Sequence, residues 1–280
     1  MRITLFGLGE AGGAIAADLA AAGVDVHGFD PADVATPAGV RRHDSPQSAV
    51  ACSELVLAVT AAADAPLALA QASGEFPAGI VYADLATGTA GLKQRLAAGA
   101  ATAGVRFADV ALMAPVPGKG LRTPALVSGS GAGAFVEMMA PLGMPVESAG
   151  PTAGAAATRK LLRSVVIKGL TALLVESMEA AHAAGFADET WDNLVEQFTA
   201  ADGALLRRLV EGTAPHALRR LHEMEASVSL LEELGVDPVM TRSTVESLRR
   251  INGGAQLPAL PAAAQRSTST GQTATPSSSR

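Results

Sequence analysis

Three closely spaced glycines near the N-terminus are the residues whose spacing points most directly to a chemistry. Gly7, Gly9 and Gly12 follow a short β-rich run, residues 2–6, and lead into an alanine-rich helical run, residues 14–22. Glycines so placed permit a tight turn, a close backbone approach to a diphosphate and tight packing of helix on strand. The helix N-terminus then offers N–H groups and a positive dipole end to an anion. The segment predicts a dinucleotide-binding turn made of Gly7, Leu8, Gly9, Glu10, Ala11 and Gly12.

Asp30 indicates which dinucleotide this turn would bind. It ends the second predicted strand, residues 24–29, about 20 residues beyond the glycines, where a carboxylate binds the hydroxyls of the adenosine ribose. The same carboxylate would repel the 2′-phosphate of NADP, and residues 31–34 contain no Arg or Lys to attract it. We therefore expect NAD as the cofactor in preference to NADP. Thr60 and Thr87, each after a predicted strand, are expected near the nicotinamide half.

A second group of polar side chains interrupts an otherwise apolar helical run, residues 155–184. The polar residues are spaced by three and four positions and so share one stripe of a helix: Lys160, Arg163, Ser164 and Lys168. Charges on a buried helix are costly unless they are paired or used, so we expect this stripe at an interdomain cleft or a subunit boundary. A lysine there could exchange a proton with a substrate oxygen during hydride transfer. A stripe that faces solvent is the alternative, and periodicity alone does not separate the two.

The composition describes a globular protein and excludes several classes of partner. Of the 280 residues, 49% are apolar and 17% are charged, and the formal net charge is −6. This balance gives no reason to expect nucleic acid or an anionic membrane as a partner. We recognise neither a signal peptide nor an apolar run long enough to span a membrane, and expect a cytoplasmic protein. Cys52, the only cysteine, is expected to be a small buried residue, and no His, Cys or Asp spacing suggests a metal site.

Short β runs alternate with helical runs in the first half of the chain, the pattern of a doubly wound parallel sheet. The predicted strands are residues 2–6, 24–29, 54–60, 79–84, 105–110 and 125–128. After residue 150 the pattern is helical, with predicted helices at 155–184, 187–197, 199–211, 217–234 and 238–251. We predict an α/β N-terminal Rossmann domain over 1–149, an all-helical substrate and dimerisation domain over 150–254, and a disordered tail over 255–280.

The helical run of residues 155–184 is apolar around nearly all of its circumference. A helix of this kind is normally buried inside a larger helical assembly. One small helical domain cannot cover it, so we expect a homodimer or larger oligomer that forms through the helical domain.

The order of these parts resembles the β-hydroxyacid dehydrogenase family, which includes 3-hydroxyisobutyrate dehydrogenase and is related to 6-phosphogluconate dehydrogenase. The family's Gly-Leu-Gly-x-Met-Gly fingerprint is matched by residues 7–12. Its Asp-x-Ser-Thr motif is matched by residues 84–87, with Ala86 in place of serine. Its glycine-rich segment before a long helix is similar to residues 150–164, with one residue inserted. The resemblance implies that Lys160 is the catalytic acid/base.

Other family positions are only partly matched. The paired asparagines after the catalytic lysine fall on Arg163 and Ser164, and a family Lys-Asp pair falls on His222 and Glu223. The resemblance favours a substrate-binding role for His222, whereas spacing alone favours a surface ion pair between Glu223 and Arg219 on that helix.

The departures mark a divergent branch of the family. Residues 109–115 align with the family's substrate-binding Asp-Ala-Pro-Val-Ser-Gly-Gly and lack the serine and both glycines. The basic loop that follows, residues 115–124, has no counterpart there. Arg122 in this loop, or Arg163, is a candidate anchor for a substrate carboxylate, because guanidinium binds carboxylates in a bidentate manner.

The leading hypothesis is an NAD-dependent oxidoreductase that transfers hydride between nicotinamide and a small hydroxy acid or a related carbonyl compound. Lys160 would be the acid/base and Ser164 its hydrogen-bonding partner. An imine reductase shares this architecture but usually lacks a lysine at the catalytic helix position, so Lys160 counts against it. A dinucleotide-binding redox sensor without turnover is a further alternative, because the family's Ser and Asn positions are not matched.

Overall fold

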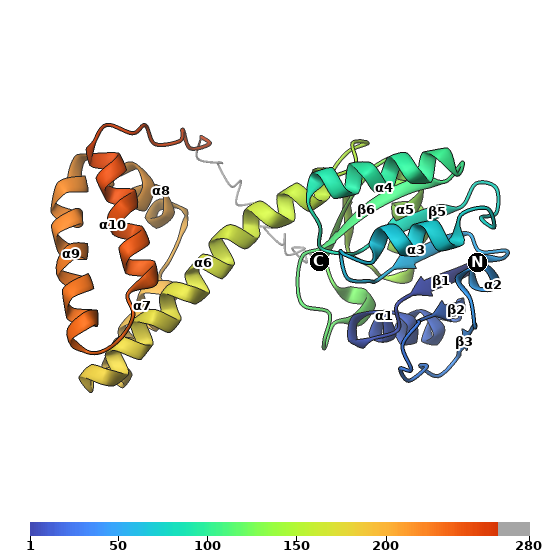
Figure 1. Cartoon of the computed structure of the whole chain (residues 1–280), viewed down its shortest axis with the longest axis horizontal. Coiled ribbons are helices and arrows are strands. Elements are labelled where there is room, and N and C mark those ends of the chain that lie inside the picture. Colours follow the sequence, from blue (N-terminus) through green and yellow to red (C-terminus); the bar gives the residue numbers. More distant parts are fainter. Residues whose placement is uncertain (263–280) are drawn as a thin grey trace, which may run out of the picture. The chain divides into compact units, whose positions relative to one another are not determined.

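The computed structural model describes residues 1–262 of the chain. The chain divides into two compact units, and the boundary falls inside one long helix, between Ile167 and Lys168. Figure 1 shows one unit built on a sheet, coloured blue to green, and one built of helices, coloured yellow to red. Most of residues 255–280, predicted to be a disordered tail, lie outside the described part of the chain.

An eight-stranded sheet organises the first unit, in the order β3-β2-β1-β4-β5-β6-β7-β8. Neighbouring strands are parallel except β6 and β7. The strands are β1 (Arg2–Phe6), β2 (Asp25–Phe29), β3 (Val40–Arg42), β4 (Leu55–Ala58), β5 (Val81–Asp84), β6 (Arg106–Leu112), β7 (Ala125–Ser128) and β8 (Val146–Ser148). The strand order reverses beside β1, which is where doubly wound sheets bind ligands. The predicted α/β fold with a Rossmann doubly wound sheet is confirmed.

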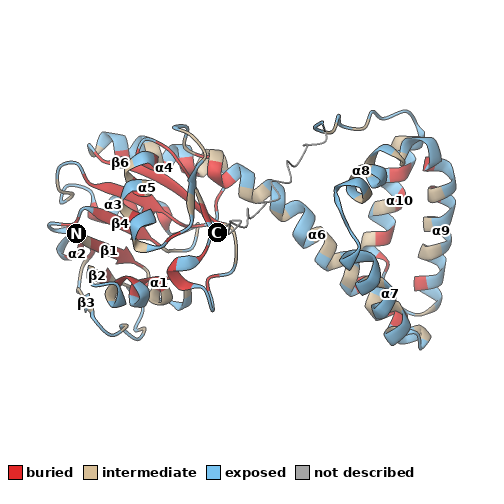
Figure 2. Cartoon of the chain, turned by 180° about the vertical axis from the view of Figure 1, so that it is seen from behind, coloured by how far each residue is buried: buried red, intermediate tan, exposed pale blue. Residues whose placement is uncertain are grey.

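Helices cover both faces of this sheet. They are α1 (Glu10–Ala21), α2 (Pro46–Val50), α3 (Ala65–Ala72), α4 (Ala90–Thr102) and α5 (Ala132–Met139), with short 3-10 turns η1 (Gly120–Arg122) and η2 (Ala140–Leu142). Side chains alternate along each strand, so in β1 Ile3 and Leu5 join the core under α1 and α5, whereas Phe6 joins the core under α2, α3 and α4. Figure 2 shows the resulting concentration of buried residues in the sheet.

The elements absent from the sequence prediction are short or weakly patterned. Strands β3 and β8 have three residues each and carry charged side chains, so neither has an apolar run. Helix α1 begins at Glu10, inside the glycine-rich segment, earlier than the predicted residue 14.

Cys52 corrects one expectation. We expected a small buried side chain, but Cys52 is exposed and has a φ of 64° in the turn between α2 and β4. Its neighbour Ser53 is buried instead, and the Ser53 hydroxyl lies 2.7 Å from Thr4 Oγ1. The left-handed turn therefore directs the cysteine outward and the serine inward.

Helix α6 (Ala155–Ala184) has 30 residues and crosses from the first unit into the second. The second unit continues with α7 (Ala187–Thr199), α8 (Gly203–Glu211), η3 (Ala214–His216), α9 (Ala217–Glu233) and α10 (Val239–Asn252). No strand occurs in its described residues, and the predicted helical C-terminal region is confirmed. Leu221, Val245 and Leu248 form its buried apolar cluster, between α9 and α10. Within residues 1–262, none of the helices combines the length and the apolar character needed to cross a membrane.

Candidate functional site

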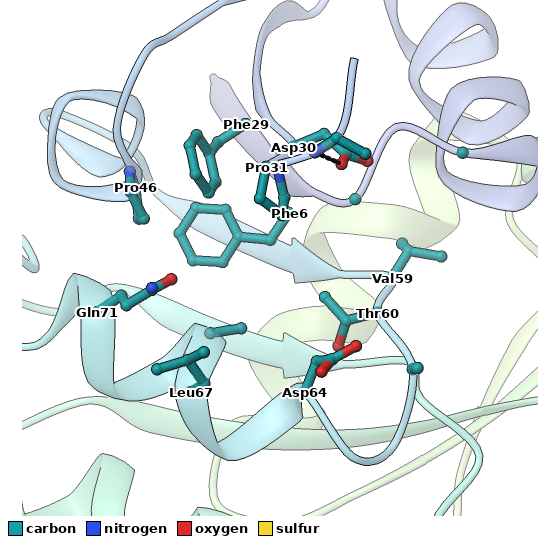
Figure 3. A pocket seen from close by; sticks show the side chains of 15 residues that line it. Phe6, Phe29, Asp30, Pro31, Pro46, Val59, Thr60, Asp64, Leu67 and Gln71 are labelled. Carbon is teal, nitrogen blue, oxygen red and sulfur yellow. Dashed lines mark hydrogen bonds between the residues drawn. The ribbon is translucent and has the colours of Figure 1, made fainter. Parts of the chain in front are cut away.

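A cavity of about 470 Å³ opens at the carboxyl ends of β1, β2 and β4. Its wall includes apolar side chains from the strands and from α3, namely Phe6, Phe29, Val59 and Leu67, and polar residues Asp30, Thr60, Asp64 and Gln71. Figure 3 shows Asp30 and Pro31 on one side of this cavity, Asp64 and Leu67 on the other, and the Phe6 ring between them. This lining suits a ligand that has a flat aromatic group and polar substituents.

The glycine turn at the edge of the cavity needs two of its glycines for packing and leaves space at the third. A Cβ on Gly7, which has a φ of 93°, would lie 2.3 Å from the Val59 carbonyl oxygen. A Cβ on Gly12 would lie 2.0 Å from the Gly7 carbonyl oxygen. By contrast, a Cβ on Gly9 would meet no described atom within 4 Å. Gly9 is also the N-cap of α1 and supplies no side chain to cap it, so the first turn of this helix suits a diphosphate.

Asp30 contacts the glycine turn directly. Its Oδ2 accepts a hydrogen bond from the Leu8 N–H at 2.7 Å, and its Oδ1 accepts one from the Ala32 N–H at 2.9 Å. Each carboxylate oxygen has a second lone pair, so a ribose hydroxyl could still donate to it. Asp30, which is predicted to bind the ribose, therefore also holds the glycine turn in place. Its spacing in the sequence does not reveal this second role.

The guanidinium of Arg42 contacts the loop after Asp30. Arg42 lies beyond residues 31–34, the segment that contains no Arg or Lys. Arg42, at the end of β3, donates to the carbonyl oxygens of Asp30 at 3.0 Å and Ala32 at 2.6 Å, and also to that of Val34. These bonds fix the loop and direct the cation toward backbone oxygens. This contact could not be predicted from the sequence, because it depends on β3, a strand of three residues that the sequence pattern does not reveal.

The other predicted cofactor residues differ in their surroundings. Thr60 lines the cavity, and its buried hydroxyl has no hydrogen-bond partner within residues 1–262, which leaves it available to a ligand. Glu10 is exposed in the first turn of α1, and Ala11 packs against the core. Glu10 and Ala11 therefore contribute backbone to the turn.

Lys160 and Thr87, 73 residues apart in the sequence, are joined by a hydrogen bond. The Lys160 Nζ donates to Thr87 Oγ1 at 2.9 Å. Both residues line a small pocket together with Gly88, Asp109 and Ala157. Thr87 follows β5, whose carboxyl end lies at the same sheet edge as those of β1 and β4, because these strands are parallel neighbours. A lysine ammonium and a hydroxyl thus stand at the edge that carries the glycine turn.

Asp109, which lines this pocket, forms a buried cluster with Asp84 and Lys93, and neither Asp109 nor Lys93 was among the predicted site residues. Lys93 and Asp84 form an ion pair with 2.7 Å between Nζ and Oδ2, and their side chains are 1% and 0% exposed. Burial raises the pKa of Asp84, and the Lys93 ammonium opposes this increase. The signal in the sequence was one aspartate in each of two predicted apolar strands, and only the structure shows that Asp84 and Asp109 are register partners.

The remaining candidate residues are spread over the chain. Arg163, one turn after Lys160 on α6, donates to the Met113 carbonyl oxygen, and half-buried Ser164 follows it. Arg122 is exposed at the end of η1, which packs on α1. His222 is exposed on α9 of the second unit, where Arg219 and Glu223 form a pair at 3.9 Å.

In the described residues, no group of three or more His, Cys, Asp or Glu side chains is placed to hold a metal ion.

Comparison with solved structures supports the fold over most of the chain. A conserved hypothetical protein from Sinorhizobium meliloti is 29% identical, with a TM-score of 0.59, over 89% of this chain and 87% of its own. A Streptomyces aurantiacus imine reductase is 20% identical, with a TM-score of 0.74, over 89% and 94%. An Aspergillus terreus reductive aminase, solved with NADPH4, cyclohexanone and allyl amine, is 22% identical, with a TM-score of 0.75, over 90% and 94%.

A curated relative and two family matches complete the comparison. An uncharacterized 28.5 kDa protein from Methanothermus fervidus is 28% identical over 116 residues, so the match spans 46% of that relative. Residues 181–251 match a domain of unknown function, DUF1932. Residues 2–133 match the NAD binding domain of 6-phosphogluconate dehydrogenase. The chain therefore combines a segment similar to the NAD binding domain of 6-phosphogluconate dehydrogenase with a helical segment similar to a domain of unknown function.

Proposed function

We propose that this protein is an NAD(P)-dependent oxidoreductase that interconverts a small hydroxy acid, or a related alcohol, with its carbonyl compound. The observation that carries the proposal is the hydrogen bond from Lys160 to Thr87 at the sheet edge that also bears the glycine turn. A redox sensor without turnover needs the turn but has no use for a lysine held beside it. The lysine therefore favours an enzyme over a sensor.

The proposed chemistry divides between cofactor and protein. A bound nicotinamide would supply or accept the hydride. Lys160 would donate a proton to the substrate oxygen during reduction and take it back during oxidation, while the Thr87 hydroxyl orients Nζ. Arg163 on the same helix is the proposed carboxylate anchor, with Ser164 as a hydrogen-bonding partner and Arg122 and His222 as further candidates.

Imine or amine substrates are the second candidate. The similarity in fold to an imine reductase and a reductive aminase covers about nine-tenths of both chains and supports this reading. Lys160 opposes it, because protonation by a lysine suits a carbonyl or hydroxyl oxygen. Substrate assays must therefore include a ketone with an amine as well as hydroxy acids.

We also propose that NAD binds more tightly than NADP. The Asp30 carboxylate lines the cavity, and the nearby Arg42 donates to three backbone carbonyl groups. A 2′-phosphate would meet a negative charge beside a cation that is already engaged. Substituting Asp30→Ala should narrow the ratio of the two dissociation constants, and equal or tighter NADP binding by the unmodified protein would contradict this proposal.

A homodimer is the proposed assembly. In the single chain, apolar side chains of α6 remain exposed, among them Leu162 at 66%, Val165 at 72% and Val166 at 66%. A contiguous apolar surface of this kind marks an interaction site in a soluble protein. A second copy of the chain is the occupant that the long apolar helix predicts.

The decisive experiment measures nicotinamide turnover on a substrate panel with the purified full-length chain. Thermal shift with NAD present first selects ligands, because binding raises stability by mass action. On a verified substrate, Lys160→Ala should reduce kcat by roughly 100- to 10,000-fold, the range of general acid–base groups. The affinity of Lys160→Ala for NAD should be unchanged. Lys168→Ala, on the same helix, is the control and should affect kcat far less. Near-normal turnover in Lys160→Ala would refute the catalytic role of Lys160.

A further inference from the structure

The buried ammonium of Lys93 holds the segment that leads to Thr87. Lys93 lies on α4, and its Nζ donates to the Asp84 carbonyl oxygen at 3.1 Å, to Asp84 Oδ2 at 2.7 Å and to the Ala86 carbonyl oxygen at 2.7 Å. A lysine ammonium has three donors, so these bonds use all of them. Two of the three bonds fix backbone oxygens just before Thr87. The position of the Thr87 hydroxyl therefore depends on Lys93.

Asp109 holds the helix that carries Lys160. Its Oδ2 accepts hydrogen bonds from the N–H groups of Gly154 at 3.0 Å and Ala157 at 3.1 Å, and from Ser128 Oγ at 3.0 Å. A carboxylate at a helix N-terminus is favoured by the helix dipole. The first turn of α6 is thereby attached to β6 and β7, and Lys160 follows Ala157 by one turn.

Lys93 connects these two arrangements. Its Nζ lies 3.4 Å from Asp109 Oδ1, an oxygen that accepts no hydrogen bond within residues 1–262. Asp84 and Asp109 are register partners on parallel strands, so their side chains leave the sheet on the same face. Two charged carboxylates buried side by side repel each other strongly unless a cation lies between them. Lys93 is that cation, and it contacts both the Thr87 segment and the cap of α6.

We propose that Lys93 is a positioning residue that keeps Lys160 within hydrogen-bonding distance of Thr87. Removal of the ammonium releases the backbone before Thr87 and weakens the attachment of Asp109, so the two partners separate. The catalytic part of this inference rests on the proposed function. The geometric part, which concerns how Lys160 is held, does not.

The test uses a charge-balanced variant, because Lys93→Met alone leaves two buried carboxylates without a cation. The double variant Lys93→Met with Asp84→Asn removes both members of the ion pair. Arg95→Met is the matched control, since Arg95 is an exposed cation on the same helix. Circular dichroism verifies folding, and Ser128→Ala, which removes one bond to Asp109, is the milder second variant.

The first readout is the reactivity of Lys160 toward acetic anhydride in the folded full-length chain, measured by peptide mass spectrometry against the exposed Lys119. We expect the Lys160-to-Lys119 labelling ratio to rise roughly twofold to tenfold in the double variant, as for the loss of one hydrogen bond. A smaller rise is expected in Ser128→Ala and none in Arg95→Met. The second readout, on a verified substrate, is a fall in kcat of about 100-fold or less with an unchanged dissociation constant for NAD.

The two readouts separate the possible failures. An unchanged labelling ratio in the folded double variant overturns the positioning role, because a merely structural lysine would alter stability and leave Lys160 as it was. A raised labelling ratio with an unchanged kcat supports the positioning role and contradicts Lys160 as the acid/base. A raised ratio with a lowered kcat supports both.

Discussion

The two compact units cover their apolar side chains to very different degrees. In the first unit the sheet is buried by helices on both faces, and Leu5, Tyr82 and Phe107 are completely enclosed. In the second unit, none of the residues of α7 or α8 is buried, and Trp191 is 53% exposed. Figure 2 shows the same contrast between red strands and largely pale blue helices. The sheet of the first unit is enclosed, whereas α6, including its part in the first unit, and the helices of the second unit leave apolar side chains exposed.

This contrast supports the proposal that the enclosed sheet carries the ligand site and that the exposed helices, α6 among them, mediate association. A close-packed core fixes strand ends to within the tolerance that positioning of a cofactor and of the proposed catalytic lysine demands. Exposed aliphatic and aromatic side chains on a helix supply non-directional stabilisation when another surface covers them. We therefore expect substitutions around the sheet to change binding and turnover, and substitutions on the exposed helices, including α6, to change association.

The largest expected effect comes from placing a charge on the exposed side of α6. Val165→Lys should leave the monomer folded but raise the dimer dissociation constant by roughly 100-fold, because burial of an uncompensated charge costs about 3 kcal/mol or more. Val165→Ala is the matched control and should have a much smaller effect. Sedimentation at micromolar concentration measures both. A wild-type chain that sediments only as a 28.1 kDa species would remove the basis of the comparison.

The fold was largely predictable because its strongest signals are local. The alternation of β and helical runs predicted the doubly wound sheet, and the helical run of residues 155–184 matched the bounds of α6. Strands β3 and β8 were not predictable, because a three-residue strand with charged side chains is defined by its neighbours. Cys52 was misjudged for a related reason, since the sign of its φ is set by a turn between two short elements.

The candidate site was predictable only where a motif carries it. The glycine turn and Asp30 have fixed spacing, and Lys160 followed from a family resemblance. The ion pair between Lys93 and Asp84 has no such spacing, and a single lysine in a helix with exposed neighbours ordinarily indicates solvent. Its burial depends on two acids that meet only when β5 and β6 pair.

The second largest effect is expected at the glycine turn of the first unit. It compares Gly12, which close packing requires, with Gly9, which leaves space for a ligand. Gly12→Ala places a Cβ 2.0 Å from the Gly7 carbonyl oxygen, so we expect a loss of roughly 1–3 kcal/mol of stability together with weaker NAD binding. Gly9→Ala meets no described atom within 4 Å and has a φ of −63°, so stability should change by less than about 0.5 kcal/mol. NAD binding should nevertheless weaken, because the methyl group occupies space needed by the diphosphate.

Urea denaturation and titration with NADH measure the two glycine variants together. Equal losses of stability in Gly9→Ala and Gly12→Ala would show that the space above Gly9 is closed by packing. Unchanged NADH affinity in Gly9→Ala would place the diphosphate elsewhere.

The smallest expected effect lies in the core of the first unit, at one of the buried polar atoms that lack a hydrogen-bond partner within residues 1–262. The Tyr82 side chain is fully buried, and its hydroxyl has no hydrogen-bond partner within residues 1–262. Burial raises the pKa of this phenol, so it stays neutral and loses only its hydrogen bonds to water on folding. Tyr82→Phe deletes that unsatisfied group and keeps the ring contacts with Phe6, Phe76 and Phe107. We expect the free energy of unfolding to stay level or to rise by up to about 1 kcal/mol.

Thr4→Val is the matched control for Tyr82→Phe, because the buried Thr4 hydroxyl is hydrogen-bonded to the Ala49 carbonyl oxygen at 2.6 Å and to Ser53 Oγ at 2.7 Å. Its removal leaves partners unsatisfied and should cost roughly 1–2 kcal/mol, measured as a lower urea midpoint with an unchanged slope. If Tyr82→Phe costs as much as Thr4→Val, the phenol has a bound partner such as water. The core of the first unit would then be less dry than its apolar lining indicates, and the contrast with the helical unit would be one of degree.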